Sequence, residues 1–473
     1  MTRPATSAGT VFTRARAIGF AIAIVMGFGV LASPVPHGLS QPAHSVLAIT
    51  VFTVLLWVFQ VFNNGISSIL MIGLMILAKI PVGLALSGFS SPQFWVLLVV
   101  LFYGFAMQRT GLAHRISYYI LSLFSHTYQG ILWGFFFIGL ILALGIPPMT
   151  VRTAILVPIG WALVESLGLA PRSRGAALIM ITVVEMAVAP GCAFLYGSLF
   201  GPVVEGVFQA KHLPLSWLSY SRVLAFPTLL LCGLMVVVNQ FVLRPEAPLQ
   251  VSPGFARQKL QALGPIKRTE WITAVVVILS IAYWATGRIH HLPSFLIGMF
   301  ALAAFGITGI VGDSDIAGGV SWTLLLYLGG IFSLANVIEN AKITDWPAGY
   351  MVPVVRHLTS NVVLFVVVLA LAMLALKFLD PSGFVALPAL FLPISDITLA
   401  AGIPSLVLVT PLIVASTPFW ATYENFWMAM GEGMTSGQAF SAGQRVRLAN
   451  TYAILALVAF AISVAFWKLT GVL

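Results

Sequence analysis

Long apolar runs recur along the whole chain, and they constrain its fold more than any other feature. A run of about 18 or more apolar residues is long enough to cross the hydrocarbon core of a bilayer as an α-helix. Only 8% of the 473 residues are charged, whereas a typical soluble domain carries about 25%. The mean hydropathy of +1.03 agrees with this. The sequence therefore predicts an all-α polytopic membrane protein in the lipid bilayer.

The predicted fold has about 11 transmembrane helices and two broken apolar regions. The helices are expected near 17–33, 44–62, 64–84, 92–110, 175–205, 217–243, 270–286, 290–310, 320–340, 404–433 and 447–470. The broken regions are 128–166, interrupted at Gly145-Ile-Pro-Pro148, and 361–400, interrupted at Asp380-Pro-Ser-Gly383. Proline ends a helix, and each arm of roughly 16 residues is too short to span comfortably. We therefore expect two re-entrant helical hairpins whose tips lie within the membrane.

Positive charge is concentrated between the apolar runs, so the net charge of +10 indicates membrane topology and not nucleic-acid binding. The loop 244–270 carries five basic residues: Arg244, Arg257, Lys259, Lys267 and Arg268. Placing this loop in the cytoplasm puts the N-terminus inside and the C-terminus outside a bacterial-type inner membrane. The basic residues before the first apolar run resemble a signal peptide, but a retained first helix is the simpler interpretation.

Short motifs recur in the same order in the two halves of the chain. Ala154-Ile-Leu-Val-Pro-Ile159 resembles Ala389-Leu-Phe-Leu-Pro-Ile394, and Val204-Glu205-Gly206 resembles Gly431-Glu432-Gly433. An odd number of crossings per repeat would invert the second copy, and inverted repeats with broken helices are typical of secondary transporters. The predicted organisation is a first segment with one helix, a first repeat, a basic linker and a second repeat, at 1–43, 44–243, 244–269 and 270–473.

Several of these stretches resemble the divalent anion:sodium symporters, the dicarboxylate, citrate and sulfate permeases of the ion transporter superfamily. The resemblance rests on motifs in both halves: Gly88-Phe-Ser-Ser-Pro92, Gln108-Arg-Thr-Gly-Leu112, Ile155-Leu-Val-Pro-Ile159, Trp322-Thr-Leu-Leu-Leu-Tyr-Leu-Gly-Gly330 and the stretch 418–473. The family implies a homodimer in which a fixed scaffold carries a mobile elevator domain with both hairpins. It also implies a Ser-Asn-Thr motif at each hairpin tip that helps to bind sodium and substrate carboxylates.

This chain departs from the family at both tips. The first tip has Pro148-Met149-Thr150 and the second has Gly383-Phe384-Val385 after Ser382. Only Thr150 keeps the expected residue type, so sodium coupling through the usual sites is in doubt. No cofactor is expected.

The first hairpin tip contains two candidate substrate-binding residues. Thr150 is expected to cap the second arm or to donate a hydrogen bond to a substrate. Arg152 is a charge within an apolar region, where it needs a partner or a function. It could bind an anionic substrate, form an ion pair with Asp380, or snorkel to the cytoplasmic face.

The remaining candidates lie at the second tip and in two spans that are expected to be unwound. Asp380 could cap a helix, pair with Arg152 or carry a coupling proton, beside Ser382 and Gly383 as binding residues. The unwound spans contain Pro190, Gly191, Thr417 and Pro418, where free carbonyls could hold a cation. Thr422, Tyr423 and Asn425 are further binding candidates, and Glu185 and Glu424 are coupling candidates.

These features favour a secondary active transporter that moves a small anion by an elevator mechanism, with no enzymatic activity. A di- or tricarboxylate, another organic acid or sulfate would all suit the candidate site. A cation/proton antiporter run by Glu185, Asp380 and Glu424 is the alternative.

Overall fold

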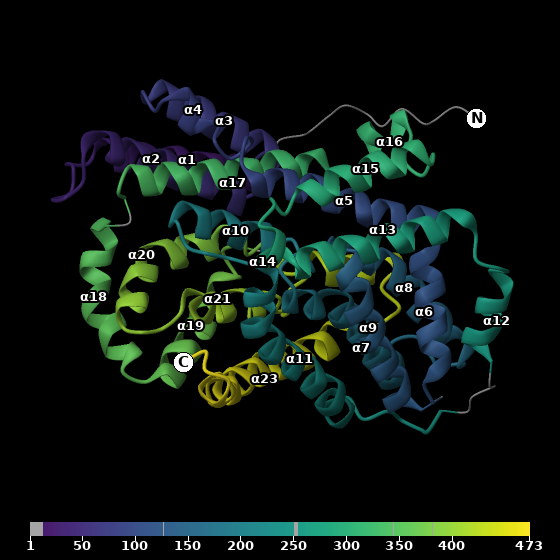
Figure 1. Ribbon diagram of the computed structural model, residues 1–473. Helices are drawn as coiled ribbons and strands as arrows, with labels where there is room; N and C mark the ends of the chain where they lie inside the picture. The colour runs from purple at the N-terminus through teal and green to yellow at the C-terminus, as the bar shows by residue number, and fades with distance from the viewer. Residues whose placement is uncertain (1–12, 126, 250–253, 344, 381) are drawn as a thin grey trace. The chain divides into compact units, whose positions relative to one another are not determined.

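The computed structural model describes residues 13–125, 127–249, 254–343, 345–380 and 382–473, and these form helices joined by turns and loops (Figure 1). The predicted N-terminal basic segment therefore lies partly outside the described residues, as do four residues of the predicted linker. The chain divides into two compact units, 1–89 with 322–346, and 90–321 with 347–473.

The first unit packs helices closely through small residues. It contains α1 (Arg14–Ala32), α2 (Gln41–Val58), α3 (Asn64–Leu77), α4 (Val82–Ala85) and α17 (Trp322–Asn340). Gly27 of α1 lies against Phe52 of α2, and Gly330 of α17 lies against Ser68 of α3. A glycine in a membrane helix lets a neighbouring helix approach closely, so these contacts are favourable by packing alone.

The second unit holds the two broken regions and the remaining helices. Its first part contains α5 (Pro92–Thr110), α6 (Leu112–Leu123), α7 (Tyr128–Gly145), α8 (Met149–Ser166), α9 (Arg174–Val188), the short 3-10 helix η1 (Ala189–Ala193), α10 (Phe200–Ala210), α11 (Trp217–Val242), α12 (Phe255–Ala262), α13 (Arg268–Ala285), α14 (Gly287–His290), α15 (Leu296–Ile307) and α16 (Asp313–Gly318). Its second part contains α18 (Asp345–Thr359), α19 (Val362–Leu376), α20 (Ala386–Ala400), α21 (Ser405–Val414), α22 (Phe426–Met434) and α23 (Ala442–Leu469).

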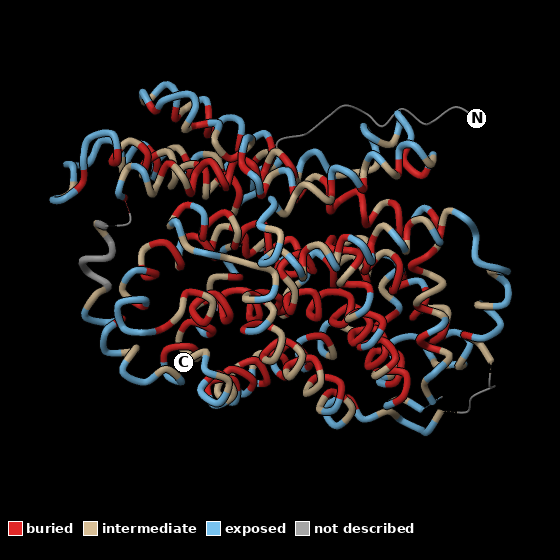
Figure 2. The backbone as a smooth tube through the Cα atoms, in the orientation of Figure 1, coloured by how far each residue is buried: buried red, intermediate tan, exposed pale blue. Residues whose placement is uncertain are grey.

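Helix α9 forms the centre of the second unit. The most apolar 18-residue window of Arg174–Ala193 is 100% buried within the protein, as the continuous red trace of α9 illustrates (Figure 2). By contrast, the corresponding window of α13 is only 28% buried. A helix that is apolar on all sides and fully enclosed is a core element, and both arms of the first hairpin, α7 and α8, pack against α9.

The first broken region is a helical hairpin, as predicted. Helix α7 runs parallel to α9, since Gly175 lies against Tyr128 and Gly139 lies against Met186. Helix α8 runs in the opposite direction, because Arg152 contacts Ala187 whereas Gly160 contacts Met180. The two arms are therefore antiparallel, and the tip at 146–148 lies beside the C-terminal end of α9.

The predicted arm lengths are wrong for the first hairpin. Helices α7 and α8 each have 18 residues and are long and apolar enough to cross a membrane, whereas α19 and α20 have 15 residues each. Helix α7 ends at Gly145, where the break was predicted, and Pro148 stands at the N-cap of α8, so only three residues separate the two arms and each arm is longer than the expected 16 residues.

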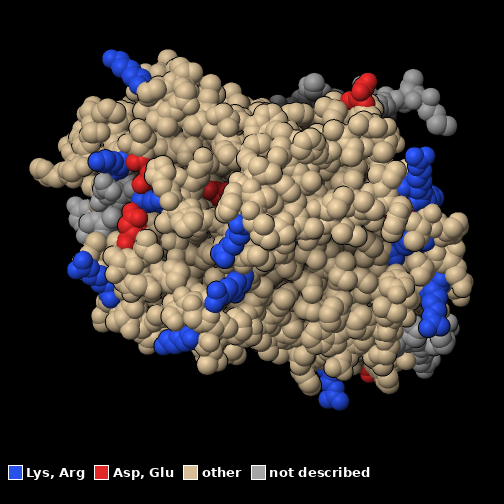
Figure 3. Space-filling view, viewed as in Figure 1, with Lys and Arg blue, Asp and Glu red and all other residues tan. Residues whose placement is uncertain are grey.

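Within the described residues, nine helices are long and apolar enough to cross a membrane, or up to ten if the bent pair α5–α6 is one span. Five further apolar helices, α3, α15, α19, α20 and α21, are shorter than 18 residues. One face of the surface bears few Lys, Arg, Asp or Glu side chains, as expected for a chain that lies in lipid (Figure 3).

Candidate functional site

Two helices of the second unit are interrupted where the sequence predicts unwound spans. Helix α9 ends at Val188, and α10 begins at Phe200 after the 3-10 turn that contains Pro190 and Gly191. Helix α21 ends at Val414, and α22 begins at Phe426, so Thr417 and Pro418 lie in the second interruption. We call 189–199 the first break and 415–425 the second break. Both leave backbone groups free to meet side chains or a ligand.

Arg152 joins the first hairpin tip to the first break. Its side chain is fully buried. Its Nε donates to the carbonyl of Ala187 at 2.6 Å, and its Nη1 donates to the carbonyls of Ile146 at 2.6 Å and Gly197 at 2.7 Å. Its Nη2 donates to the carbonyl of Val188 at 3.3 Å. The planar guanidinium therefore holds three separate stretches of backbone in one geometry.

Two of the three roles expected for Arg152, an ion pair with Asp380 and snorkelling to the membrane surface, do not fit this arrangement. No hydrogen bond of Arg152 within the described residues goes to a carboxylate, so the expected pair with Asp380 does not form. Its complete burial also rules out snorkelling to the membrane surface. Most of its donors are already used by carbonyls, which leaves little capacity for direct contact with a substrate. Its positive charge, however, is not neutralised by these neutral partners.

Thr150 does not cap the second arm, contrary to one of its two expected roles. Helix α8 begins at Met149, its N-cap is Pro148, and no side chain accepts a hydrogen bond at that end. Thr150 is the second helical residue, where its hydroxyl cannot reach the first free amides. Its Oγ1 instead accepts a hydrogen bond at 3.3 Å from the Nε1 of Trp427 in α22.

Asp380 does cap the second hairpin. One carboxylate oxygen accepts from the amide and the hydroxyl of Ser382, at 3.1 and 2.6 Å. The other accepts from the amides of Val385 and Ala386 at the start of α20, at 2.9 and 2.8 Å. Gly383 lies between them with a φ of +75°, a conformation that favours glycine. The capping interpretation is therefore confirmed, and both carboxylate oxygens are occupied.

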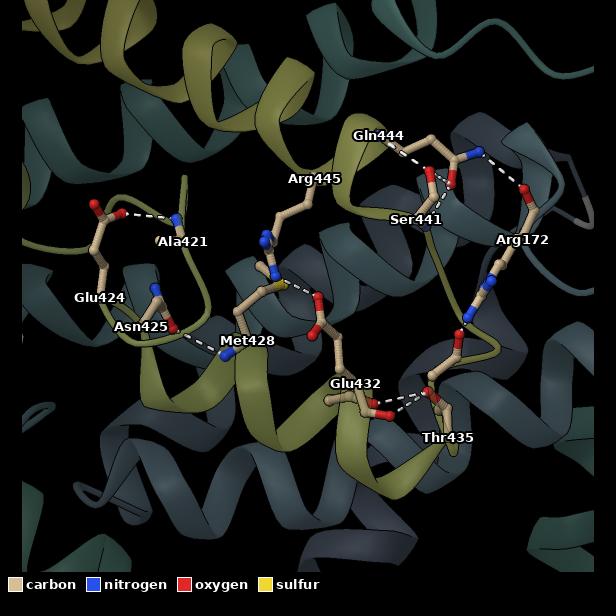
Figure 4. Close-up of polar contacts among 12 residues, drawn as sticks. Arg172, Ala421, Glu424, Asn425, Met428, Glu432, Thr435, Ser441, Gln444 and Arg445 are labelled. Atoms are coloured by element: carbon tan, nitrogen blue, oxygen red, sulfur yellow. Dashed lines mark hydrogen bonds and ion pairs between the residues drawn. The ribbon is translucent and has the colours of Figure 1, made fainter. Parts of the chain in front are cut away.

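Lys377, at the end of α19, is a buried cation close in sequence to the cap residue Asp380. It is 0% exposed, and the carboxylates of Asp380 and Glu424 both act on its charge. Glu424 is also buried, and its Oε2 accepts a hydrogen bond from the amide of Ala421 at 3.0 Å (Figure 4). The second hairpin tip and the second break thus share one cluster of charges.

The other candidates of the second break divide into buried and exposed groups. The Oδ1 of Asn425 accepts from the amide of Met428 and so caps α22 (Figure 4), while its Nδ2 donates to the carbonyls of Thr417 and Pro418. Its amide is therefore used within the protein. Thr422 and Tyr423 are exposed.

Glu185 lies where the two breaks meet. Its Oε2 accepts a hydrogen bond at 3.0 Å from the Nδ2 of Asn239 in α11, and its Oε1 is buried with no partner among the described residues. Glu185 lines a small cavity, large enough for about one water molecule. Residues from both breaks also line it: Ala189 from the first, and Thr417, Phe419 and Asn425 from the second.

Two residues that contribute to this site, Asn239 and Tyr452, were not predicted from the sequence, although the sequence did contain a signal for Asn239. Asn239 interrupts the apolar run of α11, and a polar residue inside a spanning segment points to a specific partner. Tyr452 of α23 lines the same cavity and its hydroxyl contacts Thr417 Oγ1 at 3.0 Å. Tyrosines are common in membrane helices, so its sequence context carried no such signal.

A family model described as the sodium:sulfate symporter transmembrane region matches residues 14–472, almost the whole chain. The chain belongs to this family. The resemblance noted in its motifs is thereby confirmed, and with it the assignment to transporters of the dicarboxylate and sulfate type. The relatives described next are named as transporters.

Two named relatives are similar over most of the chain. Dicarboxylate transporter 1 of the spinach (Spinacia oleracea) chloroplast is 24% identical over 380 residues, which cover 78% of this chain and 67% of the relative. The putative malate transporter YflS of Bacillus subtilis is 24% identical over 336 residues, 69% of this chain and 70% of the relative.

Two solved structures share the fold. The YdaH transporter of Alcanivorax borkumensis aligns with a TM-score of 0.56 at 14% identity, over 97% of each chain. MtrF of Neisseria gonorrhoeae aligns with a TM-score of 0.54 at 12% identity, over 97% of this chain and 96% of its own. Identities this low support the fold alone.

Proposed function

We propose that the protein is a secondary active transporter that moves a small anion across a bacterial-type cytoplasmic membrane by an elevator mechanism. The anion would be a di- or tricarboxylate, another organic acid or sulfate. The observation that carries this proposal is the meeting of the two breaks around one buried cavity, beside a buried arginine whose partners among the described residues are all backbone carbonyls. A relative named as a malate transporter and one named as a dicarboxylate transporter support the same substrate class.

The hairpin tips suggest where the anion would bind. The 235-residue offset between Pro158 and Pro393 aligns Asp380 with Gly145. The N-terminus of α20 therefore has its own carboxylate, whereas the N-terminus of α8 has no side-chain cap. A helix N-terminus stabilises negative charge, and the charge of Arg152 adds to this effect. A carboxylate or sulfate group of the substrate would take at α8 the place that Asp380 takes at α20, with Thr150 beside it.

Reciprocal packing supports the proposed inverted repeats. Helix α8 of the first half packs on α22 of the second, through Thr150 with Trp427 and Val157 near Gly431. Helix α20 of the second half packs on α10 of the first, where Phe200 and Phe384 are 5.0 Å apart and Phe208 stacks on Phe391 at 5.4 Å. One arm of each hairpin thus lies against the broken span of the other half.

Coupling is proposed to differ from the family's sodium mechanism. The first tip contributes only Thr150 as a side-chain oxygen, and at the second tip Asp380 is already occupied by four hydrogen bonds. Of the three predicted coupling residues, Glu185 is the one without a cation beside it and with a free oxygen. That oxygen also favours the alternative function, a cation/proton antiporter.

The assembly and orientation follow from the family and from the basic linker. We infer a homodimer with the N-terminus inside and the C-terminus outside. Arg257, Lys259, Lys267 and Arg268 are all exposed around α12, as expected for a cytoplasmic face rich in positive charge.

Counterflow in liposomes tests the function. The purified protein is reconstituted with unlabelled malate inside, labelled malate is added outside, and succinate, citrate and sulfate are offered as competitors. We expect transient accumulation of label, which persists when choline replaces sodium. Absence of counterflow with every anion, together with sodium or proton flux, would favour the antiporter. Steep activation by sodium would contradict the proposed coupling.

A further inference from the structure

A second cavity lies between the end of the first break, α10 and the α13–α14 turn. Its volume is about 300 Å³, room for several water molecules. Aromatic side chains line much of its wall: Tyr196, Trp217, Tyr283 and Trp284. The polar groups on the wall are Glu205 of α10, Ser216, His290 and Ser294. The cavity is therefore wide enough for water and has a single carboxylate on its wall.

Glu205 has no cationic partner among the described residues. Its Oε1 accepts hydrogen bonds from the hydroxyl of Tyr196 at 3.3 Å and from the hydroxyl of Ser294 at 3.1 Å. Its Oε2 is buried and has no partner among the described residues. An ionised carboxylate in such a position is costly unless a cation or a proton neutralises it.

The repeat-related glutamate shows what Glu205 lacks. Glu432 occupies the matching motif in the second half, and it forms an ion pair with Arg445 at 2.5 Å (Figure 4). Two glutamates in equivalent motifs thus have opposite environments. One carries a permanent counter-charge from a neighbouring helix, and the other faces a cavity.

The other titratable groups around Glu205 do not supply this charge. On α14, His290 donates from Nε2 to the carbonyl of Tyr283 and accepts at Nδ1 from the amide of Leu292, which fits a neutral ring. Arg288 of the same turn donates to Ser216. These bonds hold both side chains away from a role as ion-pair partners of Glu205.

Polar side chains on the helices that pack on α10 are already bonded to other groups, so they do not pair with Glu205 either. On α5, the hydroxyl of Tyr103 is bonded to Ser280. On α20, Asp396 is paired at 2.8 Å with Lys211, the residue that follows α10. A metal ion would need several oxygen ligands, and the described residues contain no group of three or more His, Cys, Asp or Glu side chains that could hold one.

We propose that Glu205 is a proton-binding site through which transport is coupled to the proton gradient. Oε2 takes a proton from a hydronium ion in the cavity water, giving the neutral acid and water, and returns it when the carboxyl meets water at higher pH. The inference rests on the proposed transport function for its role, but the protonation itself does not.

The first test detects the proton without requiring transport. Dicyclohexylcarbodiimide adds to protonated carboxyl groups, and mass spectrometry locates the product. We expect modification of Glu205 in the wild-type protein at about pH 5 that declines toward about pH 9. Glu432, held by Arg445, is the matched control in the same sample and should stay unmodified. No modification of Glu205 at any pH would overturn the proposal.

The second test concerns coupling. In Glu205→Gln, malate accumulation driven by a pH gradient should be lost, whereas malate counterflow, which needs no gradient, should continue. Glu205→Asp should restore part of the gradient-driven accumulation, and melting temperatures check that each variant is folded. Wild-type accumulation in Glu205→Gln would overturn the proposal. Absence of counterflow in the wild-type protein would instead count against the transport function and leave the labelling result to decide protonation.

Discussion

The two hairpins each contain a buried cation, and they neutralise it in different ways. In the first hairpin, Arg152 is held by backbone carbonyls and has no carboxylate partner in the described part of the chain. In the second, Lys377 is accompanied by Asp380 and Glu424. The second hairpin therefore contains its own anions, while the first keeps an unneutralised charge next to an uncapped helix. This difference supports our proposal that the first hairpin is the one that receives the substrate anion.

The largest expected effect comes from removing the guanidinium of the first hairpin. Arg152→Gln should destabilise the protein by about 3–5 kcal/mol, because several buried carbonyls lose their donor at once. Arg152→Lys should lose almost as much, since an ammonium cannot reach all of these carbonyls. Melting temperatures of the purified variants measure the effect. The exposed Arg447→Gln is the control, and equal melting temperatures for it and Arg152→Gln would contradict the structural role.

The second hairpin should respond as a coupled charge cluster. Lys377→Met leaves the Asp380 and Glu424 carboxylates without their cation, so it should destabilise the protein. Combining it with Glu424→Gln should recover part of the loss, with a coupling of about 1–3 kcal/mol between the two changes. A double-mutant cycle on melting data checks this. Strict additivity would mean that the two charges do not interact.

A smaller effect is expected at the contact between the first hairpin and α22. Thr150→Val removes the acceptor of the Trp427 indole hydrogen bond and should cost about 1 kcal/mol. Thr150→Ser keeps the hydroxyl and should retain nearly wild-type stability. If the valine and serine variants melt at the same temperature, the hydrogen bond between Trp427 and Thr150 does not stabilise the tip of the first hairpin.

The smallest effect is expected at Glu246, which lies outside the membrane-spanning helices. Its carboxylate accepts hydrogen bonds from the backbone amides of Arg174 and Gly175 at the start of α9. Burial opposes the shift, but these hydrogen bonds hold the pKa of Glu246 below its ordinary value. The carboxylate therefore stabilises the fold above its ordinary pKa, and this contribution is lost as the pH falls through the lowered value.

Glu246 and Arg174 are both about half exposed, so Glu246→Gln should cost less than about 1 kcal/mol at pH 7. The difference in melting temperature between the wild type and the variant should shrink as the pH is lowered toward 3. A difference that grows at low pH would contradict the assignment.

Much of the fold was predictable because the length of an apolar run, the position of a proline and the identity of a capping residue can all be read directly from the sequence. The two breaks and the cap by Asp380 depend on such local signals. The partners of Arg152 were not predictable. Every residue has a backbone carbonyl, so residue type does not show which carbonyls accept hydrogen bonds from Arg152, and these carbonyls come together only in the folded hairpin. The same is true of Trp427 as the partner of Thr150, which lies 277 residues away.

The affinity of the two Arg152 variants for the transported anion tests the central claim most directly. Arg152→Lys keeps the charge without the carbonyl-binding fork, whereas Arg152→Gln loses both. Equilibrium binding of labelled malate is measured below the melting temperature of each variant. We predict a Kd close to that of the wild type for the lysine variant and one weaker by about tenfold or more for the glutamine variant, from the loss of one charge at short range. A wild-type Kd in Arg152→Gln would contradict the claim that the unneutralised charge of the first hairpin attracts the substrate.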